Sequence, residues 1–296
     1  MDAYQPPLDQ FLRFPEEPGF GLAWPDYLAL GFDSGHVPEL IRMATDRSLN
    51  EADEESPEVW APVHAWRTLG QLRAEAAIGP LLAILAAQTL ETSDDWASEE
   101  LPVVIGMIGP AAIPEARSIL EDPSASDEAR IDACRSLGEI GQIHPTARDE
   151  CVAILSMCLE QGQDTPPDVN AFLVNELIKL GADEAAGVIE RAFAAGIVDE
   201  SVNGSWYDVW HALDLDGEPP LRPERRVVID EDEDEWDDEE RDWVNPFRRL
   251  DGPAHPHEPR PGWQPADSRT PEERKDRNKA LQKLVKKVKG KKGKKR

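Results

Sequence analysis

Lysine is nearly missing from most of this sequence of 296 residues. Lys179 is the only lysine before Lys275, whereas residues 271–296 hold ten. That C-terminal stretch has 13 Lys/Arg and 3 Asp/Glu, a net charge of +10, so the preceding 270 residues carry −37 within a total of −27. The sequence therefore predicts an acidic body and a basic tail. Because phosphate binding needs a positive face, a body of that charge argues against nucleic acid on its own surface.

Patterns typical of metal-binding, nucleotide-binding and membrane-spanning proteins are missing as well. The three cysteines, Cys134, Cys151 and Cys158, form no C-x-x-C pair, which favours a reducing cytoplasm and no zinc. No glycine-rich phosphate loop occurs, so no cofactor is expected. No apolar run approaches the ~20 residues of a membrane span. The first residues lack a basic and then apolar signal segment. We expect a soluble cytoplasmic protein.

The alternation typical of strands is missing from residues 25–215, where a helical repeat is found instead. Four segments each contain an apolar pair, a turn element and a second apolar helix; they span residues 67–85, 102–120, 134–155 and 175–193. Gly70, Gly106, Gly138 and Ile178 occupy equivalent positions, 36, 32 and 40 residues apart. A period of this size suits a helix–turn–helix unit.

Residues typical of helix starts and closing helices flank these units. Thr165, Ser205 and Thr270 each precede an acidic residue at N-capping spacing, so each predicts a helix start. Residues 205–215 predict a closing helix with Trp206 and Trp210 on one face.

Glycines at the expected turns predict where the first helix of each unit ends. Gly109, Gly141 and Gly181 stand where a left-handed residue is needed, and Arg73 replaces glycine in the first unit. Residues 24–46 predict one more helix pair upstream of the first unit.

These patterns predict an all-α protein. Helix pairs with one apolar face bury it against neighbouring pairs, which gives an α-solenoid of about five pairs plus the closing helix. The predicted organisation is an N-terminal arm, the solenoid, an acidic and Pro-rich disordered linker, and a lysine-rich tail with a short amphipathic helix, at residues 1–24, 25–215, 216–270 and 271–296.

The units resemble HEAT-type repeats, in particular the short bacterial form named from phycobilisome-lyase-like proteins. The pattern A-L-G-x-I-G-x-x-x-A-I/V-P-x-L of that form is similar to SLGEIG (136–141), IGMIGPAAIPEA (105–116) and LGQLRAEAAIGPLL (69–82). Longer stretches, such as LALGFDSGHVPELIRMATD, look like a bacterial HEAT-repeat family of uncharacterised function. The resemblance implies a fold over roughly residues 25–215 and no activity. Relatives in that family often end in a SEC-C metal motif, which this chain lacks because no cysteine follows Cys158.

One cluster within the repeats has two interpretations. His64 lies beside Trp66 and Arg67, and a histidine near an arginine can serve acid–base chemistry. The spacing of Trp60 and Val63 favours core packing in a helix instead. Trp66 and Arg67 are the candidate partner-binding residues here, on the expectation of an exposed ridge, because Trp and Arg are frequent in interface hot spots.

The linker contains a run of acidic residues at 230–240, which we expect to be disordered. Its simplest interpretation is a solubilising tail. Trp236 and Trp243 allow a second one, in which an acidic and aromatic segment binds a basic partner.

The basic tail has a narrow apolar stripe surrounded by lysines, at Ala280, Leu281, Leu284, Val285 and Val288. Such a helix could contact RNA, a ribosome or an anionic membrane surface. Alternatively, the tail binds the acidic body, chiefly the 230–240 run. The candidate contact residues are Lys283, Lys286, Lys287, Lys291 and Lys292.

Three hypotheses for function remain. The first is a non-enzymatic HEAT-repeat scaffold or adaptor that binds a partner protein. The second is a nucleic-acid- or ribosome-associated factor that acts through the basic tail. The third is a lyase-like enzyme of the HEAT type that uses His64 or His211. We predict no catalytic, cofactor-binding or metal-binding residues.

Overall fold

The computed structural model describes residues 4–14, 24–53, 56–89, 94–222 and 279–285. In these ranges every regular element is a helix and no strand occurs, so the all-α prediction is confirmed for them. A helix without a label covers residues 279–285. The α-helices are α1 (Val37–Ala44), α2 (Arg47–Asn50), α3 (Ala61–Gln71), α4 (Ile78–Ala86), α5 (Asp95–Ile108), α6 (Ile113–Leu120), α7 (Asp127–Ile143), α8 (Pro145–Glu160), α9 (Pro167–Lys179), α10 (Ala186–Ala194), α11 (Glu200–Asn203) and α12 (Trp206–Ala212).

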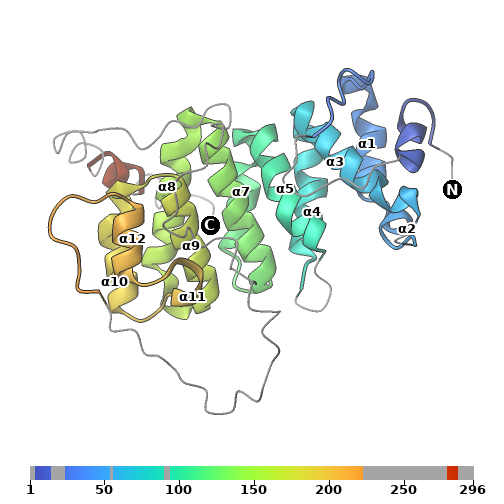
Figure 1. Ribbon diagram of the computed structural model, residues 1–296. Coiled ribbons are helices and arrows are strands. Elements are labelled where there is room, and N and C mark those ends of the chain that lie inside the picture. Colours follow the sequence, from blue (N-terminus) through green and yellow to red (C-terminus); the bar gives the residue numbers. More distant parts are fainter. Residues whose placement is uncertain (1–3, 15–23, 54–55, 90–93, 223–278, 286–296) are drawn as a thin grey trace, which may run out of the picture.

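The helices follow one another along the molecule in chain order (Figure 1). One row is formed by α1, α3, α5, α7 and α9, each of which packs against the next. The helices between them pack across this row: α4 against α5, α6 against α7, and α8 against both α7 and α9. The helices α5, α7 and α9 therefore each pack against at least one chain neighbour as well as against the row, and each keeps one exposed side.

Polar side chains cap several of the helices, in one case where the sequence predicted a start. Ser126 accepts a hydrogen bond from the Ala129 amide, and Ser205 forms a capping box with Asp208 at the start of α12. The helix start predicted after Thr165 is present, since α9 begins at Pro167, but the predicted cap is wrong: Pro166 is the N-cap residue and no side chain caps the helix. A proline at the first helical position has no amide hydrogen that needs a cap.

The turns inside the repeats share one form. A short 3-10 helix precedes the second α-helix in three of them: η4 (Glu75–Ala77), η5 (Pro110–Ala112) and η7 (Asp183–Ala185). Gly109 and Gly181 have the expected positive φ, and Arg73 takes a φ of 50° in the place of glycine. The prediction for Gly141 is wrong, because α7 continues through it to Ile143.

The residues at the repeated glycine position lie where neighbouring helices come closest. A Cβ added at Gly106 in α5 would stand 2.7 Å from Glu139 Cβ in α7. A Cβ at Gly138 would overlap the carboxylate of Glu176 in α9, and one at Gly70 would touch Val104 in α5. Glycine at these positions lets each helix of the row approach the next.

Gly106→Ala is expected to lower the free energy of unfolding by about 2 kcal/mol. Overpacking against the Glu139 backbone outweighs the gain of up to ~1 kcal/mol in helix propensity. Gly79→Ala in α4 is the control, because its Cβ would meet only the Glu115 carboxylate, at 3.5 Å from Oε1 and 3.8 Å from Oε2, which are ordinary contacts. Urea denaturation of both variants checks this; equal stability of the two would contradict the close approach of α5 and α7.

The N-terminal part of the chain covers α3. The 3-10 helix η1 (Leu8–Arg13) packs against α3, and its Phe11 is fully buried with Tyr27 and Phe32. The predicted helix pair at 24–46 is wrong in part. Residues 27–31 form a turn, and α1 is the only α-helix of this segment. Aromatic packing on α3 takes the place of a helix pair here.

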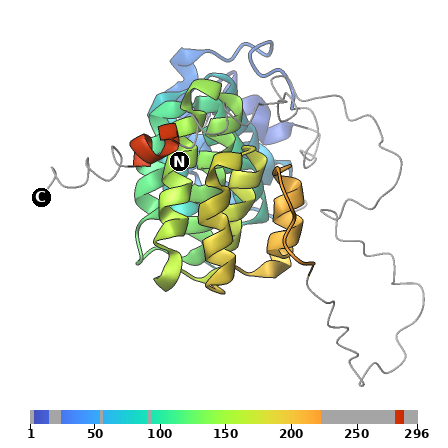
Figure 2. The ribbon, with the colours of Figure 1, turned by 90° about the vertical axis from the view of Figure 1, so that its left-hand side faces the viewer.

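The helix at residues 279–285 lies at the end of the molecule opposite the N-terminal elements (Figure 1). Figure 2 shows it and α12 on opposite sides of that end. Among the described residues, no single helix has the length and apolar character needed to cross a membrane. The segments Asp95–Ile108 and Pro110–Leu120 meet that test only together, and they meet at a bend of 111°.

Candidate functional site

The cluster of His64, Trp66 and Arg67 is part of the interior. Arg67 forms two bonds to Glu100 in α5, one from Nε to Oε2 at 2.6 Å and one from Nη2 to Oε1. Trp66 Nε1 donates to the same Oε2 at 3.2 Å. Arg67 also lies over the Trp24 ring, with 5.0 Å between Cζ and the ring centroid. These contacts satisfy the charge of each partner and fix α3 on α5.

The expectation that Trp66 and Arg67 form an exposed ridge is wrong. Their exposed fractions are 1% and 2%. The N-terminal segment with Phe11 and Tyr27 covers α3, and residues Ala61 to Gly70 are all buried. Neither side chain is therefore available to a partner in this structure.

His64 lies in an aromatic pocket of the core. Tyr27 Oη and His64 Nδ1 are hydrogen bonded over 2.8 Å, and the rings of Phe11 and Phe14 lie 5.4 Å and 4.8 Å away. Its Nε2 is buried without a hydrogen-bond partner. Burial, and secondly the charge of Arg67, lower the pKa of His64 to about 4. His64 is therefore neutral at physiological pH.

The exposed side of α5, α7 and α9 carries hydrogen bonds and an ion pair that join α5 to α7, and it is our candidate site. We call it the α5–α7–α9 face and define it by Glu99, Val103, Arg135, Glu139 and Lys179. All five side chains are partly or fully exposed. The glycines Gly106 and Gly138 described above bring the three helices close enough to form one continuous surface.

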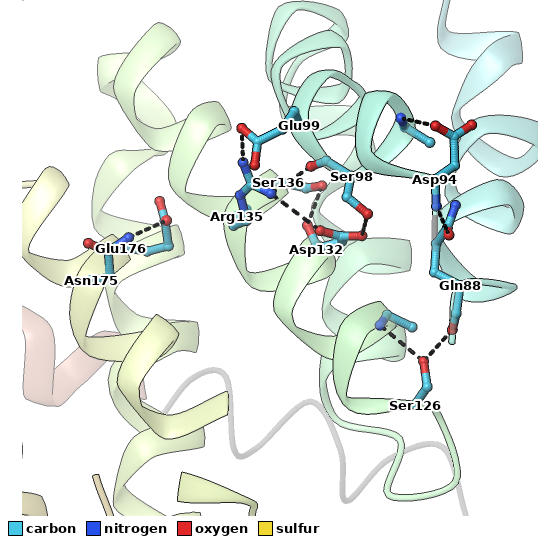
Figure 3. Close-up of polar contacts among 12 residues, drawn as sticks. Gln88, Asp94, Ser98, Glu99, Ser126, Asp132, Arg135, Ser136, Asn175 and Glu176 are labelled. Atoms are coloured by element: carbon cyan, nitrogen blue, oxygen red, sulfur yellow. Dashed lines mark hydrogen bonds and ion pairs between the residues drawn. The ribbon is translucent and has the colours of Figure 1, made fainter. Parts of the chain in front are cut away.

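Arg135 is the best-anchored side chain of this face (Figure 3). Its Nη1 donates to the Ser98 carbonyl at 2.6 Å, and its Nη2 donates to Glu99 Oε2 at 3.0 Å. Nη1 also lies 3.6 Å from Asp132 Oδ1. Ser98 Oγ donates to the other oxygen of Asp132 at 3.2 Å. The guanidinium therefore bridges α5 and α7 and is held by three groups.

Two buried carboxyls lie beneath the face. Burial raises the pKa of Asp132 to about 6, against the lowering effect of Arg135. Burial also raises the pKa of Glu176, which Lys179 opposes by a contact of 2.8 Å from Nζ to Oε1. Asn175 Nδ2 donates to the same oxygen at 3.3 Å (Figure 3). The exposed cations of the face thus have buried acidic partners, which fixes their positions.

A second group of contacts in Figure 3 holds the starts of α5 and α7. Ser126 Oγ donates to the Gln88 carbonyl at 2.6 Å, and the Asp94 amide donates to Gln88 Oε1 at 2.8 Å. Asp94 in turn caps the Trp96 and Ala97 amides. Gln88 therefore ties the chain after α4 to two helices of the face, which limits their movement relative to each other.

A pocket of about 430 Å³ lies near the C-terminal end of the stack. The prediction that Trp206 and Trp210 share one face is confirmed, because both side chains line it. No Lys, Arg or His is among its lining residues. Two tryptophans and four carboxylates form much of the wall: Asp183, Glu190, Trp206, Trp210, Asp216 and Glu218.

The remaining predicted residues lie on the tail helix, on α12 or outside the described residues. Lys283 is exposed on the helix at 279–285. His211 is exposed and lies against the Tyr207 and Trp210 rings, at 4.5 Å and 5.0 Å. Outside the described residues lie Thr270, Trp236, Trp243, Lys286, Lys287, Lys291 and Lys292. Within the described ranges, no group of three or more His, Cys, Asp or Glu could hold a metal ion.

Comparison of the sequence and structure with protein-family models, curated proteins and solved structures finds no match. The geometry of the described residues is therefore the basis for the proposals that follow.

Proposed function

We propose that this chain is a non-enzymatic HEAT-like α-solenoid over residues 25–215 that acts as a scaffold and binds a partner protein on the α5–α7–α9 face. The solenoid is supported by the row of α1, α3, α5, α7 and α9, in which each helix packs on the next. It is also supported by glycine at one repeated position of three helices, where the next helix comes closest.

The observation that carries the binding proposal is the anchoring of Arg135. Its guanidinium bonds to Ser98 O and Glu99 Oε2, and its side chain is still 18% exposed. An exposed arginine fixed before binding loses little conformational entropy when a partner carboxylate pairs with it. Lys179, which is 40% exposed and held by Glu176, adds a second fixed cation on the neighbouring helix.

The face alternates in charge, which suits recognition of a partner with the complementary pattern. Glu99 is 59% exposed next to Arg135. Glu139 lies four residues after Arg135 on α7, and Lys179 follows on the neighbouring helix α9. Complementary charges of this kind set specificity and orientation more than total affinity. We further propose a reducing cytoplasmic setting, supported by the three free cysteines, of which Cys134 and Cys151 are buried.

Charge reversal on the face should abolish partner capture. The full chain serves as bait in affinity purification at low and high salt. Proteins captured by the wild type should be lost with Glu99→Lys and Lys179→Glu, because each places a repulsive charge opposite the partner. Glu115→Lys, an equal charge change on exposed Glu115 of α6, is the control and should retain them. Loss with all three variants, or with none, would contradict binding at this face.

The second candidate function, binding of RNA or a ribosome through residues 271–296, is favoured by the exposed Lys283 and the net charge of +10. The same purification with a bait that lacks residues 271–296 distinguishes the two candidate functions. RNA that still copurifies at low salt without the tail contradicts this candidate, whereas the protein partner should remain.

A further inference from the structure

The helix at residues 279–285 packs against the body by one side. Leu281 is only 8% exposed and joins the hydrophobic core, and Leu284 and Val285 are partly buried against that core. Gln282 and Lys283 point to solvent on the same helix. Three residues of the predicted apolar stripe, Leu281, Leu284 and Val285, are thus covered by the body, whereas Ala280 is exposed and Val288 lies outside the described residues.

The connection to the body does not dictate where this helix lies. Residues 223–278 separate it from the end of the preceding described segment, a chain of 56 residues. An extended chain spans up to ~3.3 Å per residue, so this length reaches any part of the molecule. The helix lies at the C-terminal end and on the side opposite α12 (Figure 2), so the contact itself selects that position.

We propose that residues 279–285 are a releasable ligand of the body, and that the surface beneath them is a binding site for a basic amphipathic helix. The proposal commits to the tail of this chain as the occupant. Only Leu281 is largely buried, so the contact is small. A contact of this size holds mainly because the tether keeps the tail at an effective concentration of the order of millimolar. The inference does not rest on the proposed function, because it is argued from the burial of residues 279–285 and not from the contacts of Arg135 or Lys179.

The binding test uses full-length proteins and a fluorescent synthetic peptide of residues 271–296. Leu281→Asp places a carboxylate on the buried side of the helix. Gln282→Asp makes the same change of charge on its exposed side and is the matched control. We expect the peptide to bind the Leu281→Asp protein about tenfold or more tightly than the wild type or Gln282→Asp, because only the first has vacated the site.

Two results would overturn the proposal. Equal binding to the three proteins would mean that the tail does not occupy the site. If the peptide does not bind the Leu281→Asp protein at about 1 mM, the tethered tail, at a similar effective concentration, cannot occupy the site either. A repeat at roughly 0.5 M salt, where charges are screened within a few ångström, separates apolar docking from attraction by charge alone. We expect binding to persist there, and its complete loss would contradict docking through Leu281.

Hydrogen exchange on the wild-type full chain gives a measurement that needs no variant. Amides of residues 282–285 should exchange at least about tenfold more slowly than in the free peptide, because docking stabilises the helix. Equal exchange in the protein and the peptide would overturn the proposal, even if the Leu281→Asp protein fails to fold.

Discussion

Glu100→Gln is expected to lower the free energy of unfolding by about 3–5 kcal/mol. The substitution removes the negative charge that pairs with Arg67, and the arginine stays buried without a counter-ion. Side-chain exposure of the pair is 2% for Arg67 and 5% for Glu100, so water cannot replace the lost partner. Urea denaturation of the variant and the wild type measures the loss.

The double variant Arg67→Met with Glu100→Gln is expected to be more stable than Glu100→Gln alone. It removes both buried charges, and the new amide oxygen at position 100 still accepts from Trp66. Glu39→Gln is the control for an exposed pair, because Arg42 and Glu39 are 38% and 55% exposed at 2.7 Å. It should change stability by less than about 1 kcal/mol. A similarly small loss of stability for Glu100→Gln would show that the ion pair of Arg67 and Glu100 is not needed for stability.

Acidification from pH 6.5 to 4 is expected to cost the folded state up to roughly 3 kcal/mol through His64 alone. The pKa of His64 is lowered to about 4 by burial, whereas an unfolded histidine titrates near 6.5. The unfolded state therefore binds the proton first as the pH falls. The contribution of neutral His64 to the free energy of unfolding is fully present above pH 6.5 and is lost as the pH falls from 6.5 to 4.

Asp132 acts in the opposite direction, so a variant is needed to isolate His64. Its pKa is raised to about 6, so its carboxyl binds a proton in the folded state first and favours folding as the pH falls over this range. His64→Gln removes the histidine titration and leaves that of Asp132. The difference in stability between wild type and His64→Gln should shrink from pH 7 to 4. A constant difference would contradict the buried, neutral state of His64.

The sequence allowed prediction of the helical elements because the repeat is local. The glycine position, the capping Ser205 and the 3.6-residue periodicity each lie within a few residues of the feature they predict. Arg73 shows the strength of the repeat, since its place in the unit predicted a glycine-like conformation and it has a φ of 50°. The shared helix face of Trp206 and Trp210 could also be predicted from their spacing alone.

The candidate site was less accessible because it depends on distant parts of the chain. Trp66 and Arg67 looked like interface residues in sequence, but a segment more than 30 residues upstream covers them. Glu100 gave no signal of its role, since an acidic residue in a helix is usually exposed. The Arg135 bridge required knowing which residues of α5 face α7, a relation that spacing within one helix does not contain.

Ile178 stands in α9 at the position that is glycine in three earlier helices of the row. Each of those glycines lies where the next helix of the row comes closest, whereas α9 has a branched side chain there and packs against the short helix α11. We therefore expect that a unit duplicated after α9 would need a second change, Ile178→Gly, before the added helix could approach α9 as closely as the helices of the row approach one another.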